Sequence, residues 1–311
     1  MFRHRLLIVF LSLMAPLAMA GEWHFAIIGD SPYSDYERRH LPGMLADISV
    51  TKPAFILHVG DIKSGTSYCS DEMYADRLAL FNSVPAPLIY TPGDNEWTDC
   101  HRLPAGSFEP TERLAHLRKV FFSQPRSLGS ETTAVRRQSD FPRARPFPEN
   151  LRWEKDGIVF ATLNIPGSDN NLAQPDEHVL RALANTAWLD AAFFRARVTR
   201  ARALVLVIHA DLYFNAYAAG TPKPAYRDFL DRLRRHVLTA RHPTVLVHGD
   251  SHRMTIDQPL LDEAGKPIAK FTRIESYGYP FLGWVRVTVP ANRRAPLRFT
   301  PNPWSPGYDE P

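Results

Sequence analysis

Short hydrophobic runs recur along the chain, and five of them stop at an acidic residue or a histidine, most with a glycine beside it. A run of about four to eight apolar residues bounded by turn-forming residues is typical of a buried strand. We therefore interpret these runs as strands whose ends carry chemically active side chains. The five ends are residues 27–30, 57–61, 89–96, 205–209 and 245–252.

Amphipathic segments separate these apolar runs. In them, hydrophobic residues recur at the spacing of about 3.6 residues that places them on one face of a helix. Strands that alternate with helices indicate a largely parallel sheet. The expected helices cover residues 36–49, 72–83, 111–122, 177–200 and 225–240.

Three further β-rich segments, residues 151–165, 268–277 and 281–289, have no helix between them. Strands joined without a helical crossover favour antiparallel pairing. The pattern therefore predicts an α/β fold of two mixed β-sheets packed face to face and flanked by helices.

The first twenty residues have the composition of a cleaved export signal. Arg3 and Arg5 precede an apolar stretch at residues 6–17, and small residues lie before Gly21. That stretch is shorter than the ~20 residues that a membrane-spanning helix needs, and no later segment is long enough. We expect residues 1–20 to be removed, the protein to be exported to the periplasm or secreted, and no membrane span to remain.

The rest of the chain is expected to form one domain over residues 21–289, followed by a Pro-rich tail at 290–311 that lies on the surface. Within the domain, residues 123–149 are rich in Pro and Arg with weak periodicity, either as a solvated loop or as a basic rim that attracts an anionic substrate. The formal net charge of +4 at pH 7 gives no argument for a nucleic-acid partner. The oligomeric state is not predicted.

The chain has two cysteines, Cys69 and Cys100, and each lies in a loop after one of the strand ends. In an oxidising compartment two such residues are expected to form a disulfide. Free thiols and metal-bound thiolates are the alternatives, although a thiolate site usually has more closely spaced cysteines.

The five strand ends predict a metal site. Ligands of open α/β sheets bind just beyond the carboxyl ends of the strands, so these ends would bring carboxylates and imidazoles to one rim. A two-metal hydrolase needs a carboxylate that bridges both ions, with further oxygen and imidazole ligands and open positions. Asp61 is the natural bridge, because Gly60 lets the backbone turn sharply before it.

The order of these motifs resembles the signature of the calcineurin-like metallophosphoesterase family, which reads Asp-x-His, Gly-Asp, Gly-Asn-His-Asp/Glu, His and Gly-His-x-His. The resemblance spans residues 23–289. It implies a sandwich of two mixed sheets and a hydrolase in which a hydroxide bridging two divalent ions attacks a small anionic phosphate ester. The matching residues are Gly29-Asp30, Gly60-Asp61, Gly93-Asp94-Asn95-Glu96, His209 and Gly249-Asp250-Ser251-His252.

The resemblance also assigns metal ligands. Asp30, Asp61 and His252 would hold the first ion, and the second ion would share Asp61. The full set of expected ligands is Asp30, Asp61, Asp94, Asn95, His209, Asp250 and His252.

Three positions depart from the family pattern. Pro32 replaces a ligand histidine, so water, Asp35 or a tyrosine such as Tyr33 or Tyr36 would have to take its place. In the last motif, Asp250 replaces a histidine.

The third departure lies in the motif at residues 93–96, which can be aligned in two registers. Without a gap, Asp94 is the ligand and Asn95 stands in the place of the catalytic histidine. With a shift of one residue, Asn95 is the ligand and Glu96 takes that place. His101, two residues after Asp99, is a further candidate for the proton donor.

The departures bear on metal identity and on activity. More carboxylate ligands favour Mn, Mg or Ca, while His209 and His252 still permit Zn or Fe. The loss of histidines at three family positions also allows a second interpretation, a catalytically weak protein of the same fold that binds a metal or a phosphate.

Overall fold

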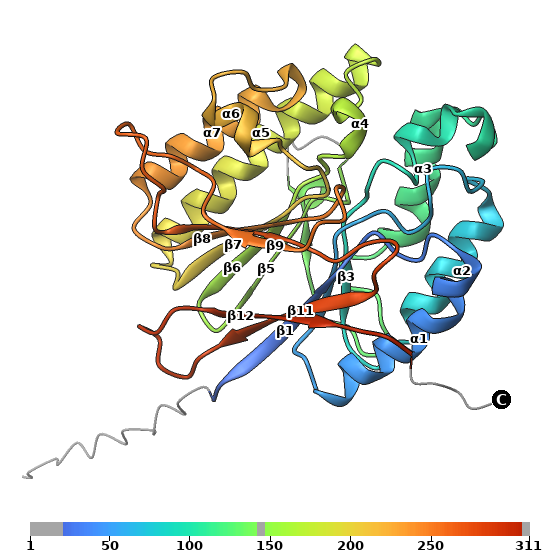
Figure 1. The fold of residues 1–311 in the computed structure, drawn as a ribbon, viewed down its shortest axis with the longest axis horizontal. Helices are drawn as coiled ribbons and strands as arrows, with labels where there is room; N and C mark the ends of the chain where they lie inside the picture. Colours follow the sequence, from blue (N-terminus) through green and yellow to red (C-terminus); the bar gives the residue numbers. More distant parts are fainter. Residues whose placement is uncertain (1–20, 142–146, 307–311) are drawn as a thin grey trace, which may run out of the picture.

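The computed structural model describes residues 21–141 and 147–306. Two mixed β-sheets face each other at the centre of the molecule, and helices cover their outer faces (Figure 1). The predicted fold class is confirmed. The predicted export signal at residues 1–20 lies outside the described residues, as do residues 142–146 of the Pro/Arg-rich segment and residues 307–311 of the tail.

The smaller sheet has the strand order β12-β11-β1-β2-β3. Strands β1, β2 and β3 are parallel, and their last residues Ile28, His58 and Tyr90 are direct neighbours in the register. Because the strand ends are level, the loops that follow them emerge side by side. The bounds are β1 (Trp23–Ile28), β2 (Ile56–His58), β3 (Leu88–Tyr90), β11 (Gly283–Val289) and β12 (Arg298–Pro303).

The larger sheet has the order β4-β5-β6-β7-β8-β10-β9, with β6, β7, β8 and β10 parallel. The two strands that carry predicted ligands, β7 and β8, are neighbours in its middle. The bounds are β4 (Arg136–Arg137), β5 (Leu151–Lys155), β6 (Ile158–Thr162), β7 (Ala203–Val207), β8 (Thr244–His248), β9 (Thr255–Asp257) and β10 (Phe271–Glu275).

All five expected helices are present, and each bound lies within two residues of the prediction. Ser34 and Ser70 begin the first two, because their side chains accept hydrogen bonds from the free backbone N–H groups of the first turn. The helices are α1 (Asp35–Val50), α2 (Asp71–Asn82), α3 (Pro110–Phe121), α4 (Gly167–Asn170), α5 (Pro175–Val198), α6 (Phe214–Ala218) and α7 (Pro224–Thr239), and the 3₁₀ turns are η1 (Thr98–His101), η2 (Leu103–Ala105) and η3 (Gln138–Asp140). None of the helices in the described part of the chain is both long and apolar enough to cross a membrane.

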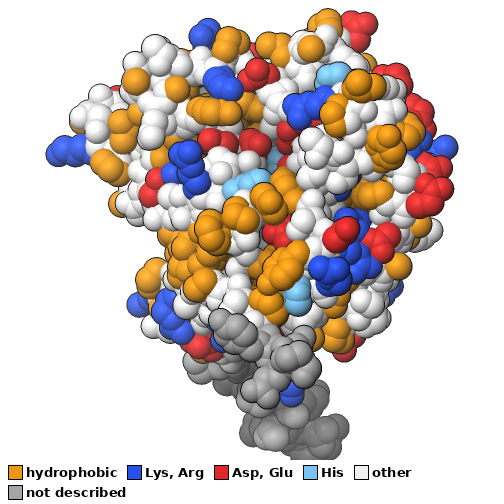
Figure 2. All heavy atoms as spheres, turned by 45° about the vertical axis from the view of Figure 1, so that its right-hand side comes forward, with side chains coloured by type: hydrophobic (Ala, Val, Ile, Leu, Met, Phe, Trp, Pro, Cys, Tyr) orange, Lys and Arg blue, Asp and Glu red, His pale blue; other side chains and the backbone are white. Residues whose placement is uncertain are grey.

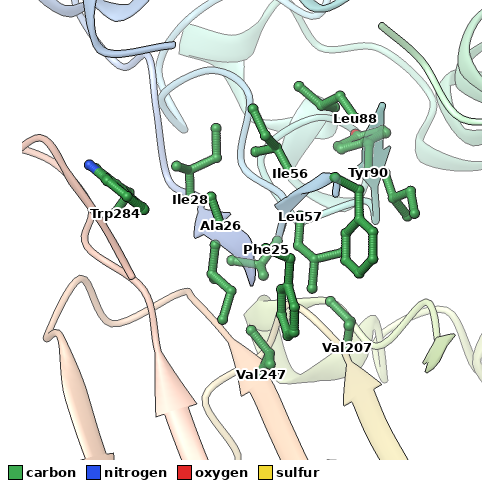
Figure 3. Close-up of a cluster of buried hydrophobic side chains, with 14 of the residues drawn as sticks. Phe25, Ala26, Ile28, Ile56, Leu57, Leu88, Tyr90, Val207, Val247 and Trp284 are labelled. Atoms are coloured by element: carbon green, nitrogen blue, oxygen red, sulfur yellow. The ribbon is translucent and has the colours of Figure 1, made fainter. Parts of the chain in front are cut away.

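The main core lies between the two sheets (Figure 3). Phe25 of β1 meets Phe160 of β6 edge to face, with ring centroids 5.5 Å apart. Along β7, Val205 and Val207 point into this core, whereas Leu204 packs on the other face against α5 and α7. Both faces of the larger sheet are thus buried, which explains why its strands read as continuous hydrophobic runs.

The tail contains a strand that the sequence pattern did not predict. Residues 298–303 form the edge strand β12, which pairs antiparallel with β11, and Trp304 then donates a hydrogen bond to Asp47 of α1. Pro301 and Pro303 obscured the strand in the sequence, because proline is compatible with a sheet only at an edge where no partner needs its missing N–H.

The predicted disulfide is confirmed. Cys69 and Cys100 are bonded and fully buried, and both sulfur atoms lie within 3.7 Å of the carbonyl oxygen of Asn95. The bridge therefore joins the loop after β2 to the loop after β3, close to the predicted metal site.

Candidate metal centre

The carboxyl ends of β1, β2 and β3 in one sheet and of β7 and β8 in the other meet at one edge of the sandwich. The loops that begin there bring predicted ligands from all five segments together. Figure 2 shows acidic and histidine side chains close together near the middle of the face that it draws. The residues whose ligand atoms converge there are Asp30, Asp61, Asp94, His209 and Asp250.

These residues form two groups, in each of which the ligand atoms lie within 4.8 Å of one another. One group is Asp30, Asp61 and His209, and the other is Asp94, His209 and Asp250. Nε2 of His209 lies 2.9 Å from Asp94 Oδ1, 3.3 Å from Asp61 Oδ1 and 3.9 Å from Asp250 Oδ1. The imidazole is therefore common to both groups, whereas the sequence assigned the shared position to Asp61.

The orientation of His209 is set by its other nitrogen. Nδ1 donates a hydrogen bond to the carbonyl oxygen of Val59 at 2.8 Å, which turns Nε2 toward the carboxylates. Nε2 and Asp94 Oδ1 are both buried and make no well-oriented hydrogen bond. A nitrogen lone pair and several carboxylate oxygens that converge in a buried space require a positive charge between them. A divalent ion with nitrogen and oxygen ligands fits this donor set.

The pKa values of the converging side chains also indicate that a positive charge stabilises this cluster. Burial lowers the pKa of His209, but the carboxylates of Asp61, Asp94 and Asp250 raise it well above its usual value. Burial raises the pKa of Asp30 to about 8 and that of Asp250 to about 6. Carboxylates that resist ionisation in isolation are stabilised as anions by a bound cation, so metal binding would release protons from this cluster.

The backbone at the strand ends is turned into a sparsely populated conformation. Asp30, Asp61, Asp250 and His252 all have positive φ, at 49°, 56°, 78° and 60°. Non-glycine residues rarely adopt this left-handed region, and clusters of them mark functional sites. All four residues are predicted ligands, and each follows the end of a strand.

Two glycines allow the loops after β2 and β3 to touch. A Cβ atom on Gly60, whose φ is 101°, would lie 2.5 Å from the backbone nitrogen of Gly93. A Cβ atom on Gly93 would lie 2.5 Å from the backbone nitrogen of Asp61. The glycines that precede Asp61 and Asp94 are thus required by close packing as well as by the turn.

Asn95 holds Asp61 in place. Its side-chain Nδ2 donates to Asp61 Oδ2 at 2.5 Å and to the Tyr33 hydroxyl at 2.9 Å, and its backbone nitrogen donates to Asp61 Oδ1 at 3.0 Å. Asp94, by contrast, belongs to a ligand group. This geometry favours the gapless register, and a ligand or catalytic role for Asn95 itself stays a prediction.

Glu96 points into the protein. It is fully buried, and its Oε1 accepts hydrogen bonds from the backbone nitrogens of Asp61 at 3.1 Å and Gly93 at 2.7 Å and from the Tyr90 hydroxyl at 2.7 Å. These contacts fix the two loops relative to each other. The geometry gives no support to the prediction that Glu96 donates a proton to a substrate.

His101 lies on the exposed end of η1. Its Nδ1 donates to the carbonyl oxygen of Thr98 at 2.7 Å, which leaves Nε2 available. Within residues 21–141 and 147–306, no hydrogen bond or ion pair links His101 to the acids of the centre. Its predicted role as proton donor stays a prediction.

Tyr33 follows Pro32, the residue that stands at the position of a histidine in the family pattern. Its hydroxyl donates to Asp61 Oδ2 and lies 3.2 Å from Nε2 of His252. Nδ1 of His252 donates to the carbonyl oxygen of Tyr279, and its Nε2 is 3.7 Å from Asp30 Oδ1. Tyr33 and His252 therefore border the first ligand group without being part of it.

The sequence did not identify several neighbours of the ligands. The hydroxyl of Ser276 donates to Asp30. Lys63 is fully buried, and burial lowers the pKa of its ammonium group to about 8, although the nearby acids act to raise that pKa. The hydroxyl of Ser168 donates to Asp94 Oδ2 at 2.7 Å. The only sequence signal for Lys63 was its position two residues after Asp61.

No family model matches the sequence, and no curated protein matches it. Solved structures do match the fold. A dimetal phosphatase from Danio rerio is 11% identical over 90% of this chain and 96% of its own, with a TM-score of 0.57. A phosphatase from Mycoplasma pneumoniae is 11% identical over 91% of this chain and 94% of its own, with a TM-score of 0.47.

A 5′-nucleotidase precursor from Thermus thermophilus is 12% identical over 91% of this chain and 54% of its own, with a TM-score of 0.46. The TM-scores of the phosphatase from Mycoplasma pneumoniae and of the nucleotidase precursor lie below 0.5, so nothing about this chain is inferred from these two structures. The similarity to the dimetal phosphatase shows a shared fold, in agreement with the predicted sandwich of two mixed sheets.

Proposed function

We propose that the protein is an exported, metal-dependent phosphoric ester hydrolase that acts on small anionic phosphate esters and uses two divalent ions. The observation that carries this proposal is the convergence of His209 Nε2 with carboxylate oxygens of Asp61, Asp94 and Asp250 in a buried space. The shared fold with a dimetal phosphatase supports the same reaction class.

Asp30, Asp61, Asp94, His209 and Asp250 would hold the ions, and neighbouring residues keep two of these ligands in place. Asn95 and Tyr33 orient Asp61 through its Oδ2, and Ser168 orients Asp94. When bound, divalent ions would neutralise charge on the phosphoryl oxygens and supply a nucleophile at neutral pH by lowering the pKa of water. Metal chemistry of this kind requires ligands that are held in a fixed orientation by hydrogen bonds from neighbouring residues.

Arg102 is placed to attract the substrate. Its guanidinium donates to the hydroxyl of Ser168 at 3.2 Å, pairs with Asp99 and remains 46% exposed. Ser168 in turn contacts Asp94, so a positive charge lies at the rim of the second ligand group. A planar guanidinium recognises phosphate oxygens well.

Export of the protein remains part of the proposal. The pattern of residues 1–20 motivates it, and the disulfide between Cys69 and Cys100 supports it, because such bonds persist in oxidising compartments. Detection of the protein, shortened by its first residues, in a periplasmic or culture fraction would test it, and a full-length cytoplasmic protein would contradict it.

Metal removal tests the hydrolase directly. Chelated protein should lose hydrolysis of an aryl phosphate, and Mn or Mg should restore it better than Cu or Ni, because four of the five converging ligands are carboxylates that suit hard cations. Elemental analysis of the purified protein should find two ions per chain. Restoration by Zn alone would show that His209 governs the choice of metal, and activity that survives full chelation would exclude the proposal.

The leaving group should strongly affect the rate. Glu96 is buried and Asn95 is bonded to Asp61, so in the described part of the chain neither of these two predicted donors is placed to protonate a leaving group. General-acid help is typically worth ~10²–10⁴-fold. Aryl phosphates should therefore be hydrolysed faster than alkyl phosphates by about that factor. A small difference that opens in His101→Ala, but not in Glu96→Gln, would instead identify His101 as the acid.

The inward position of Glu96 and the bond of Asn95 to Asp61 also keep the second candidate function, a weakly catalytic protein that binds a metal or a phosphate. Such a protein would bind phosphate without turnover. Calorimetric binding of inorganic phosphate by metal-loaded protein that hydrolyses neither aryl nor alkyl esters would favour it.

A further inference from the structure

A groove separates the C-terminal halves of α5 and α7 on the outside of the larger sheet. The helices connect parallel strands, so they run antiparallel to these strands and end at the edge opposite the metal centre (Figure 1). The groove has a volume of about 880 Å³. Its lining includes Phe193, Phe194, Arg197, Arg200, His236 and Arg241.

The groove carries uncompensated positive charge. Asp190 is its single acidic residue, and it is already paired with Arg232 and with His236 at 2.6 Å. Arg197 and Arg241 form no ion pair with any residue in the described part of the chain, and neither does Arg200. Three guanidinium groups around one cavity without an acidic partner are suited to bind anions.

Arg200, at the rim of the groove, has a left-handed backbone conformation. This residue follows the C-terminal end of α5 with a φ of 51°. Glycine is favoured at such a position, because a side chain destabilises the left-handed conformation. An arginine is nevertheless present there, at the rim of the groove.

An apolar stripe continues from the groove along α5. Leu180, Leu183, Phe194 and Val198 are spaced so that they share one face of the helix, and their exposed fractions are 43%, 57%, 57% and 52%. The opposite face is buried against the larger sheet, as Leu189 shows. A surface helix with apolar residues on both faces lacks a partner on one of them.

We propose that the apolar stripe of α5 and the adjoining arginines form a docking surface for an anionic phospholipid bilayer. The apolar side chains would enter the interface between headgroups and acyl chains, and Arg197, Arg200 and Arg241 would pair with headgroup phosphates. Charge argues against a second copy of this chain as the occupant, because Asp176 is the one exposed acid on α5 and cannot match three arginines.

Vesicle sedimentation tests the proposal with the purified protein. Vesicles of phosphatidylcholine with about 30% phosphatidylglycerol should bind it, pure phosphatidylcholine should not, and 0.5 M NaCl should weaken binding, since salt screens exposed charges. Each arginine removed should weaken binding about five-fold, so Arg197→Gln/Arg200→Gln/Arg241→Gln together should cost about a hundred-fold.

Two controls separate charge from surface. Arg126→Gln/Arg136→Gln/Arg294→Gln removes the same charge from exposed positions elsewhere and should leave most of the binding intact. Leu183→Ser/Phe194→Ser keeps the charge but should weaken binding to anionic vesicles, with an unchanged melting temperature as evidence of folding.

Four results would overturn the proposal. Equal binding to neutral vesicles, or equal losses in the two arginine triples, would exclude a specific anionic surface. A dimer in sedimentation velocity that Leu183→Ser/Phe194→Ser dissociates would assign the stripe to a second copy. Calorimetric binding of inorganic phosphate that requires the groove arginines, without vesicle binding, would assign the groove to a small anion.

Discussion

Asp61→Asn is expected to reduce hydrolysis of an aryl phosphate by more than about 100-fold and to lower the metal content of the protein with it. The estimate exceeds the ~10–100-fold typical of residues one step further from a metal, because Asp61 belongs to a ligand group itself. The substitution keeps the shape of the side chain but removes a buried negative charge that faces His209 Nε2 at 3.3 Å. Turnover and elemental analysis of the same sample measure both effects.

The matched control for this variant is Asp47→Asn. Asp47 is exposed on α1 and accepts a hydrogen bond from Trp304, so the same chemical change there should leave activity and metal content close to those of the wild type. Near-normal hydrolysis by Asp61→Asn, with both ions retained, is the result that the two-metal proposal cannot accommodate.

Loss of the disulfide between Cys69 and Cys100 should lower the free energy of unfolding by about 3–4 kcal/mol, because the bond restricts the unfolded chain over its loop. The sequence separation of the two residues is 31. Both sulfur atoms also contact the carbonyl oxygen of Asn95, which positions Asp61. Activity should therefore fall together with stability.

Denaturant unfolding of the wild type, with and without reductant, and of Cys69→Ser/Cys100→Ser measures this effect. The chain has two cysteines, so reductant has no other target in it, and reductant should leave the double variant unchanged. Equal unfolding free energies for the oxidised and reduced protein would contradict the prediction, as would two alkylatable thiols in native protein.

Local pattern was sufficient for much of the fold. The helix bounds of α1, α2, α3, α5 and α7 lie within two residues of the prediction, because periodicity and capping residues are properties of neighbouring positions. The failure at β12 has the same origin. Its two prolines argue against a strand when the local sequence is considered alone. A strand is possible there only because β12 pairs with β11 at the edge of the sheet.

Local pattern also located the candidate ligands. Each lies just after a short apolar run, and parallel strands bring such ends to one edge of a sheet, so Asp30, Asp61, His209 and Asp250 could be named before any contact was known. The pairing of Cys69 with Cys100 needed no geometry either, because the chain offers no other cysteine.

The sequence by itself thus determined the five long helices, the strands of the central apolar runs, and the acids and histidines at their ends, because these depend on residues close together in the chain. The tertiary structure alone decided that His209 joins the two ligand groups, that Glu96 turns inward to hold two loops, and that Tyr33 reaches Asp61. These assignments depend on side-chain direction and on distances between segments far apart in the sequence, as in the bond from His209 to Val59, 150 residues away. Such contacts are set by the packing of one sheet against the other, which no local pattern encodes.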